Sequence, residues 1–487
     1  MSLAESNVNE ADTGAISASI RNILDRQKAA HIKDGPLSAE KRIDWIDRAI
    51  ALLVDNQKEI AEALASDFGH RSHEQTLLTD VMGSIGPLKH AKKHLREWMK
   101  PEKRKVQFPL GLLGAKARVE YQPLGVIGII SPWNFPINLT WTPLAGVFAA
   151  GNRSMIKPSE FTPATSELMA RMIRSAYDET EVAVITGGPA VGQAFSSQPF
   201  DHLLFTGATS IAYHVMRAAA ENLVPLTLEL GGKSPVIVSK SAKMDDAAAK
   251  IMTGKTLNAG QICLAPDYVF VPEGRVDEFV SEATKSIKKM YPTLKDNPDY
   301  TSIINQRHYD RINGYVADAE AKGAKVVRIN PANEDFSQQQ THRIPPTIVL
   351  NPTDDMKVMQ DEIFGPVLPV KSYRDVSEVL GYVNDHPRPL GLYYFGEDEK
   401  EERRVLDHTT SGGVTINDVI MHVSMEDLPF GGVGPSGMGA YHGIDGFRTF
   451  SHKKAIYTQA KAKMVAEMFR APYGAKTRKV LASQIKK

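Results

Sequence analysis

The spacing of hydrophobic positions changes several times along the chain, and each change marks a predicted segment. From about residue 14 to residue 100 the apolar residues recur every three or four positions with charges between them, most clearly over 42–64, which predicts helices. Pro101 ends this segment. Over 106–123 alternation with central glycines predicts a β-hairpin or a projecting arm. Two strands bury too little surface by themselves, so we expect the arm to pack on another domain or subunit.

From residue 126 onward, short apolar runs alternate with stretches that are mostly long enough for helices, which predicts parallel sheets covered by helices on both faces. A first set of runs lies at 126–130, 154–157, 182–186, 202–205 and 226–230. A second set follows Gly231, at 234–239, 267–271, 324–329, 345–350, 365–373 and 391–395. Residues 412–418 then begin a terminal segment with a glycine-rich loop and a last strand at 455–459.

These patterns predict an α/β fold with two parallel-sheet domains and an arm. We place the first domain at 1–105 and 124–230 and the second at 231–415. The arm, an active-site loop and an oligomerisation segment occupy 106–123 and 416–487.

Charge and composition exclude several classes of protein. A net charge of +1 and the lack of a concentrated basic face argue against a nucleic-acid partner. The uncharged run 121–152 is long enough to span a membrane, but Pro132, Pro136 and Pro143 interrupt it, which favours a buried strand, loop and helix. The N-terminus lacks a secretory signal and the C-terminal tail is too charged to insert into lipid. We therefore expect a cytoplasmic protein without a membrane partner.

The stretch from Leu226 to Cys263 carries the candidate chemistry. Glu229 ends an apolar strand-like run, and Cys263 is the one cysteine of the chain. A lone cysteine forms no intrachain disulfide, which leaves packing or thiolate chemistry as its uses. A predicted helix over 245–257 is followed by a glycine-containing loop able to lift the thiol out of packing.

Two segments of this stretch, LELGGKSP at 228–235 and NAGQIC at 258–263, resemble the signature motifs of the aldehyde dehydrogenase superfamily in order and spacing. The resemblance implies a Rossmann-like cofactor domain, a catalytic domain and NAD(P)-dependent oxidation of an aldehyde through a thiohemiacetal and a thioester. It makes Cys263 the nucleophile, which requires thiolate character, and Glu229 the base that activates water. Asn134, with the Cys263 backbone N–H, is then the oxyanion donor. From the residues alone, Glu229 also fits a salt bridge and Asn134 a turn.

The phosphate-binding loop of the cofactor requires a choice between two segments. Residues 432–437 contain GxGxxG, but they follow no strand of the right kind and Pro435 removes an amide donor, so we interpret them as a structural loop near the active site. A second segment follows the run at 202–205, opens a helix and resembles the dinucleotide loop of the superfamily, although Ala212 stands where many members have glycine. Its residues are Phe205, Thr206, Gly207, Ala208, Thr209 and Ser210.

The resemblance assigns further cofactor contacts. Lys157 and Glu160 resemble the residues that hold the adenosine ribose, which favours NAD although NADP is possible. Glu362 and Phe364 resemble the pair that positions the nicotinamide ribose and ring. The remaining contacts that we expect are Pro132, Trp133, Leu230 and Gly231, and we expect no metal.

Three phrases, at 258–268, 411–419 and 428–443, are most similar to the class 3 branch of the superfamily, and within it to the coniferyl aldehyde dehydrogenases, which oxidise an aromatic alkenal. The branch implies a homodimer. Four aromatic residues fit either an apolar substrate funnel or the core: Trp133, Phe135, Phe430 and Tyr441. A CoA-acylating aldehyde dehydrogenase and a cofactor-independent thiol esterase remain as alternative functions.

Overall fold

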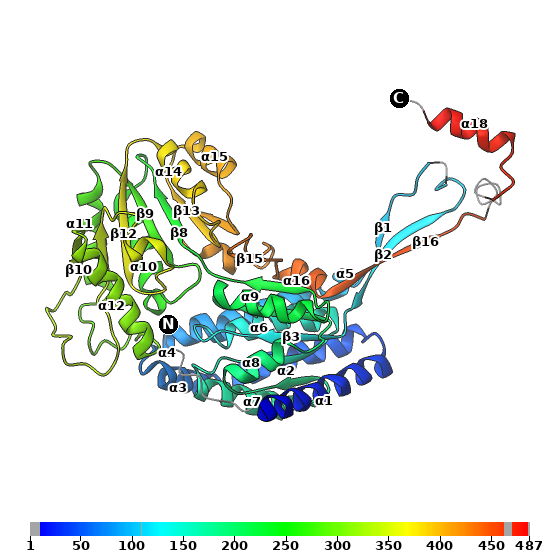
Figure 1. Ribbon diagram of the computed structural model, residues 1–487, viewed down its shortest axis with the longest axis horizontal. Coiled ribbons are helices and arrows are strands. Elements are labelled where there is room, and N and C mark those ends of the chain that lie inside the picture. The colour runs from blue at the N-terminus through cyan, green and yellow to red at the C-terminus, as the bar shows by residue number, and fades with distance from the viewer. Residues whose placement is uncertain (1–9, 109, 462–469, 486–487) are drawn as a thin grey trace.

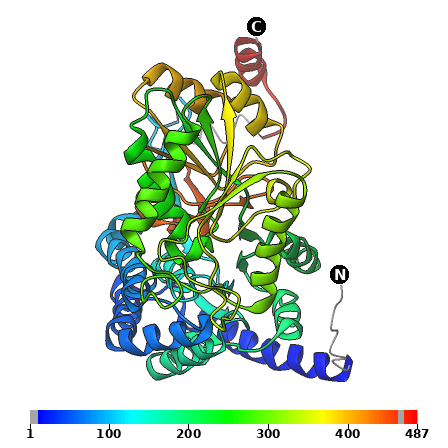
Figure 2. The same cartoon turned by 90° about the vertical axis from the view of Figure 1, so that its left-hand side faces the viewer.

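In the computed structural model, two α/β lobes lie side by side and a long β-arm projects away from them (Figures 1 and 2). The structure describes residues 10–108, 110–461 and 470–485. The outermost parts of the predicted first domain and of the predicted terminal segment, residues 1–9, 462–469 and 486–487, lie outside this range.

Helices form the N-terminal hundred residues, as predicted. They are α1 (Glu10–Asp34), α2 (Ala39–Asp55), α3 (Gln57–Phe68), α4 (His73–Thr76), the π-helix η1 (Leu77–Met82) and α5 (Gly83–Trp98). The continuous periodicity over 42–64 is divided between α2 and α3, because Asn56 lies between them and its side-chain amide donates to the Leu52 carbonyl at 2.8 Å. The sequence pattern did not predict this break.

The first sheet has six strands in the order β15-β7-β6-β3-β4-β5, all parallel except β15. Five match the predicted runs: β3 (Val126–Ile130), β4 (Arg153–Lys157), β5 (Val182–Val184), β6 (His202–Thr206) and β7 (Leu226–Glu229). The sixth, β15 (Gly437–Met438), comes from the glycine-rich loop. The connecting helices are α6 (Asn138–Ala150), α7 (Pro163–Ala176), α8 (Pro189–Ser196) and α9 (Thr209–Ala220).

Helices cover both faces of this sheet, and successive residues of β3 therefore pack against two different groups of helices. Ile127 and Ile129 join the core cluster of α2, α3, α5, α6 and α7. Val126 and Ile130 contact the cluster formed with α1, α8 and α9 on the opposite face. Such two-sided burial explains why VIGII is apolar throughout. No helix within the described ranges is long and apolar enough to cross a membrane.

The second sheet has seven strands in the order β10-β11-β12-β9-β8-β13-β14, with only β10 antiparallel to its neighbour. They are β8 (Ser234–Val238), β9 (Pro266–Pro272), β10 (Lys325–Arg328), β11 (Thr347–Leu350), β12 (Val367–Tyr373), β13 (Gly391–Phe395) and β14 (Gly413–Ile416). Its helices are α10 (Met244–Thr256), the 3-10 turn η2 (Leu257–Gly260), α11 (Val276–Met290), α12 (Gln306–Ala321), α13 (Lys357–Gln360), α14 (Val376–Asn384) and α15 (Glu399–His408).

The arm is a three-stranded antiparallel sheet in the order β1-β2-β16. The hairpin predicted at 106–123 is present, but its first strand, β1 (Glu102–Arg104), precedes that range and pairs with β2 (Lys116–Pro123). The predicted last strand is longer than expected, because β16 (Ser451–Thr458) pairs along the whole of β2. The remaining elements are η3 (Met421–Ser424), α16 (Gly443–Thr449) and α18 (Ala475–Gln484).

Candidate active site

The predicted site residues of the first domain lie along one edge of its sheet, where the parallel strands end. Lys157 is the last residue of β4 and pairs with Ile130 of β3, after which the chain continues to Asn134. Thr206 of β6 pairs with Glu229, the last residue of β7. The carboxyl edge of an open α/β sheet is where such folds bind ligands.

Cys263 reaches this edge from the second lobe through a tight left-handed turn. Helix α10 ends at Thr256, and Asn258 and Ala259 then both adopt a φ of 50°. Gly260 follows with a φ of 72°, and a Cβ at this position would lie 2.4 Å from the Gly365 carbonyl oxygen, so only glycine fits. The turn places Cys263 against the core cluster of the first lobe.

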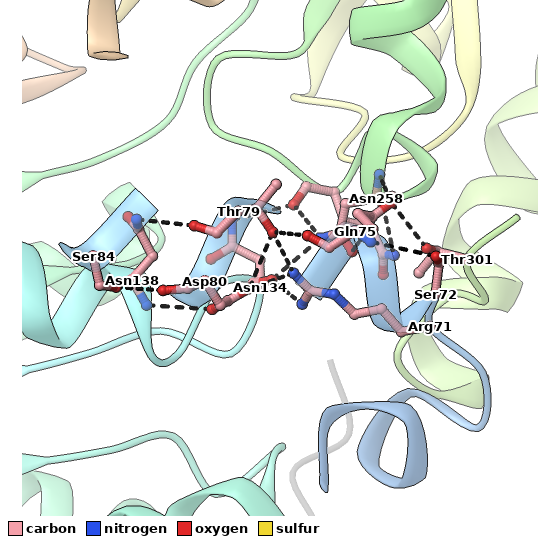
Figure 3. Close-up of polar contacts among 11 residues, drawn as sticks. Arg71, Ser72, Gln75, Thr79, Asp80, Ser84, Asn134, Asn138, Asn258 and Thr301 are labelled. Carbon is pink, nitrogen blue, oxygen red and sulfur yellow. Dashed lines mark hydrogen bonds and ion pairs between the residues drawn. The ribbon is translucent and has the colours of Figure 1, made fainter. Parts of the chain in front are cut away.

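Two hydrogen bonds tie the Asn134 loop to the loop that carries Cys263. The Asn134 side-chain amide donates to the Gln261 carbonyl at 3.1 Å. The Asn258 amide donates to the Asn134 carbonyl at 3.2 Å (Figure 3). Asn134 is buried, so these contacts fix its orientation relative to the loop that carries Cys263.

Three ionisable groups share a low-dielectric environment at this edge. Glu229 is only 3% exposed and neither of its carboxylate oxygens has a hydrogen-bond partner within the described chain. Burial raises the pKa of Glu229 well above its ordinary value. Burial also raises the pKa of the Cys263 thiol to about 12, with the negative charges of Glu362 and Glu229 adding to the effect.

The thiolate character that the nucleophile role requires is therefore not favoured by these surroundings. Desolvation and two nearby carboxyl groups all disfavour a negative sulfur. The thiol of Cys263 must lose its proton as it reacts, so a nearby base is a chemical requirement of any nucleophilic role.

The residues predicted to bind the cofactor form two groups. In the first, the buried Lys157 ammonium contacts the Glu160 carboxylate at 2.8 Å, and the Glu160 side chain is 33% exposed. Ala208 is the N-cap of α9 and provides no side-chain cap, so first-turn amides of α9 remain available to an anion. The Thr209 hydroxyl donates to the Pro435 carbonyl at 3.2 Å, and Ser210 continues the first turn.

Phe205, Thr206 and Gly207 lead from β6 into α9. Phe205 and Thr206 are buried, and the Thr206 hydroxyl has no partner within the described residues. A Cβ on Gly207 would lie 2.6 Å from the Phe205 ring, which explains a small residue there. Ala212 is buried inside α9.

The second group lies around Glu362. A Cβ on Gly231 would lie 2.3 Å from a Glu362 carboxylate oxygen. The absence of a side chain at Gly231 therefore allows the Glu362 carboxylate to lie close to the backbone. Burial raises the pKa of Glu362 to about 7, and its Oε1 lacks a partner within the described chain. Phe364 has a left-handed φ of 47° and its ring lies 5.3 Å from that of Trp133.

The neighbours of these residues complete the site. Leu230 is buried and its N–H donates to the Ser436 carbonyl at 3.1 Å. Pro132 and Trp133 are partly buried beside Asn134. Residues 432–437 form a structural loop here, since Gly437 pairs with Glu229 across β15 and β7.

The candidate funnel residues divide into two kinds. Trp133 and Phe135 are partly exposed and pack against the core cluster that Cys263 also contacts. Phe430 and Tyr441 are buried, with ring centroids 5.9 Å apart.

Residues 7–456 of the chain match the aldehyde dehydrogenase family. The chain belongs to this family. It is 66% identical to a probable coniferyl aldehyde dehydrogenase of Caulobacter vibrioides, over 97% of this chain and 98% of the relative. It is 56% identical to a coniferyl aldehyde dehydrogenase of a Pseudomonas species, over 96% of each chain. A solved Staphylococcus aureus structure described as the substrate-bound state of AldH has a TM-score of 0.88 and 35% identity, with 95% of this chain and 99% of that chain covered.

The family assignment agrees with the fold described above. This aldehyde dehydrogenase has the α/β architecture that its sequence predicted. Its membership of the family supports the use of NAD(P). The residues fit a dinucleotide: the unpartnered Glu362 oxygen is a ready acceptor for a hydroxyl group, and the α9 amides are ready donors for an anion.

Sequence reasoning missed the polar residues that hold the loops carrying Asn134 and Cys263. Arg71, Gln75 and Asp80 lie in or beside α4 and η1 and contact Asn134 or Asn258 or each other (Figure 3). It also missed Lys255, which is fully buried in α10 without a partner in the described chain and whose pKa burial lowers to about 8. The available signal was a set of polar residues at core spacing in RSHEQTLLTD, 71–80.

The raised pKa of Cys263 predicts how the cofactor-free enzyme reacts with iodoacetamide. The folded chain should show a pH–rate curve displaced to higher pH than the same chain unfolded in urea, whose thiol should titrate near about 8.5. Because the chain has one cysteine, intact mass reports this site alone. Restricted access of the reagent to the folded site lowers the absolute rate at every pH but does not by itself move the midpoint. A folded midpoint at or below the unfolded one would contradict the pKa direction.

Proposed function

We propose that this enzyme oxidises an aromatic aldehyde or aromatic alkenal, such as coniferyl aldehyde, to the carboxylic acid with NAD. The observation that carries the proposal is the position of the one cysteine, which lies beside the carboxyl groups of Glu229 and Glu362. Both oxygens of the buried Glu229 and Oε1 of the partly buried Glu362 lack a partner within the described residues. Buried polar groups in proteins are nearly always paired. Unpaired ones at the ligand edge of the sheet are expected where a substrate, a water molecule or a cofactor completes them.

Cys263 is the proposed nucleophile. Its thiol gives up a proton as the sulfur bonds to the aldehyde carbon, and the carbonyl oxygen becomes an oxyanion. The Asn134 side-chain amide and the Cys263 backbone N–H are the proposed donors to that oxyanion, a type of contact whose loss typically costs about 3–4 kcal/mol of barrier. The bound nicotinamide supplies the hydride acceptor.

Glu229 is the proposed base of the second half-reaction. Once the thiohemiacetal has been oxidised, a thioester joins the acyl group to Cys263. Glu229 removes a proton from a water molecule, whose oxygen attacks the thioester carbon, and the carbon–sulfur bond breaks to release the acid. A carboxyl group with a raised pKa suits this role, because the best general bases have pKa values near the working pH.

An aromatic substrate is favoured by two observations. Two relatives of more than half identity, aligned over nearly the whole chain, are named coniferyl aldehyde dehydrogenases. Trp133 and Phe135 add partly exposed aromatic surface to the cluster that Cys263 contacts.

NAD is the proposed cofactor because of the Lys157–Glu160 pair. Lys157 and Glu160 would hold the adenosine ribose, first-turn amides of α9 the pyrophosphate, and Glu362 and Phe364 the nicotinamide half. The remaining proposed cofactor contacts are Pro132, Trp133, Leu230 and Gly231. The partly exposed Glu160 carboxylate would repel a 2′-phosphate.

A homodimer is proposed from the arm. The loop at its tip exposes Phe108 at 82% and Leu112 at 81%, an apolar surface that a second subunit would cover. The predicted domain boundaries and the cytoplasmic location remain predictions.

A panel of coniferyl aldehyde, benzaldehyde and hexanal, each with NAD or NADP and with or without CoA, tests the function. We expect NADH and free acid without CoA, with the best kcat/KM for an aromatic substrate. Cys263→Ala should abolish NADH formation while NAD still binds, because the variant loses only the nucleophile. Dependence on CoA would favour the acylating alternative. Ester hydrolysis without NADH from any aldehyde would favour the esterase.

Glu229→Gln should separate the two halves of the reaction. The amide has the same shape but removes no proton, so we expect one equivalent of NADH per site in a burst, followed by turnover slowed roughly 100-fold or more. Rapid-mixing absorbance at the NADH band measures both phases. A missing burst would move Glu229 to the first half-reaction, and unchanged steady turnover would remove it from the mechanism.

Glu160→Gln tests the ribose assignment. Without the negative charge the preference for NAD over NADP, measured as the ratio of kcat/KM values, should narrow several-fold, because repulsion of a 2′-phosphate is removed. Glu179→Gln, a surface change at a glutamate paired with Arg26, is the matched control and should leave the ratio unchanged. An unchanged ratio in Glu160→Gln would count against the assignment.

A further inference from the structure

A buried ion pair lies behind the oxyanion loop, in the N-terminal helices and outside both sheets. Arg71, between α3 and α4, and Asp80, in the π-helix η1, have side chains with no exposed surface, and the Arg71 Nη2 lies 2.5 Å from an Asp80 carboxylate oxygen. Neither residue lies at the carboxyl edge of the sheet. Their connection to the site runs through backbone atoms (Figure 3).

The guanidinium of Arg71 uses its two arms for different partners. Nη2 binds Asp80, while Nη1 donates to the Asn134 backbone carbonyl at 2.9 Å. The Asn258 amide donates to the same carbonyl from the other side. The Asn134 peptide is thereby held between the N-terminal helices and the nucleophile loop, and a planar two-armed donor is what this geometry requires.

The nucleophile loop is held by the same helices. Gln75 of α4 donates to the Asn258 side-chain oxygen at 3.3 Å and accepts from the Asn258 backbone N–H at 3.1 Å. Asn258 is the first left-handed residue of the turn that precedes Cys263. Both loops of the proposed oxyanion site are therefore oriented by one polar cluster.

The π-helix sets the direction of Asp80. The Asp80 carboxylate oxygen that does not bind Arg71 accepts from the Asn138 backbone N–H at 3.2 Å. The Asn138 side-chain amide donates to the Thr79 carbonyl at 3.0 Å. Asn138 begins α6, four residues after Asn134. Short π-helices are often found at functional sites, and this one connects Asp80 to the start of α6.

We propose that Arg71, oriented by Asp80, is a positioning residue that aims the Asn134 amide at the developing oxyanion. The inference rests on the proposed function, because Asn134 must be the oxyanion donor. Arg71 touches neither substrate nor cofactor in this role and acts only through Asn134.

A double-mutant cycle of Arg71→Lys and Asn134→Ala tests the proposal. Lysine keeps the charge opposite Asp80 but has no second arm for the Asn134 carbonyl. Alanine removes the Asn134 side-chain amide but keeps the backbone carbonyl that Arg71 contacts. If Arg71 only stabilised the fold through this contact, Arg71→Lys would have the same effect in the Asn134→Ala background. The measurement is the rate constant of the NADH burst at saturating aldehyde and NAD.

We expect Arg71→Lys to slow the burst roughly 10-fold or more with Asn134 present, and less than about 2-fold in the Asn134→Ala background. KM for aldehyde and the Kd for NAD should change little. Equal effects in the two backgrounds, or no effect in either, would overturn the proposal. A normal burst in Asn134→Ala alone would instead overturn the oxyanion assignment of the proposed function.

Two further variants keep the test decisive. Arg153→Lys is the matched control. Arg153 is a buried arginine that pairs with Asp34 and begins β4, at the end of that strand away from Lys157. Its substitution should show no coupling to Asn134→Ala. If Arg71→Lys does not fold, Thr79→Val takes its place. The Thr79 hydroxyl accepts from Arg71 Nη2 at 3.2 Å, so its loss should give a smaller, equally Asn134-dependent decrease. An Asn134-independent decrease in Thr79→Val would overturn the proposal.

Discussion

The candidate active site depends on holding a sulfur and two carboxyl groups close together with little contact with water, Glu229 being buried and Cys263 and Glu362 partly buried. Each of the three has its pKa raised by burial, and none of the Glu229 oxygens is satisfied by the described protein. An unpaired buried polar group typically costs about 1–3 kcal/mol, so this arrangement lowers the stability of the fold. The two large sheets and their helical covers offset that cost.

The two sheets alone do not fix the geometry of this site, and the N-terminal helices contribute to it. Strand ends place Glu229, Lys157 and Asn134 on one edge, but contacts with Arg71 and with Gln75 of α4 hold the loops that carry Asn134 and Cys263. The Arg71–Asp80 pair is fully buried, and removing one partner of such a pair typically costs about 3–5 kcal/mol because the other charge is left uncompensated. The contacts of Arg71 with Asp80 and with Asn134 thus contribute both to the stability of the N-terminal helices and to the geometry of the site.

Local patterns in the sequence were sufficient for the fold and for the edge at which chemistry occurs. VIGII and GLYYF became β3 and β13 with their predicted bounds, because a strand buried on both faces is apolar throughout. The break at Asn56 was missed because it depends on one side chain capping a carbonyl. The Arg71–Asp80–Asn134 contacts join residues 63 positions apart, which periodicity does not encode. The raised pKa of Cys263 was not predicted for the same reason, because desolvation is a property of the packed site and not of the motif.

The single cysteine has a consequence for the behaviour of the enzyme under oxidative stress. With no second thiol in the chain, a sulfenic acid formed on Cys263 has no internal resolving partner with which to close a disulfide. Its repair then requires an external reductant. Protection of the resting enzyme falls to the high pKa of the thiol itself, since a protonated sulfur reacts slowly with peroxide.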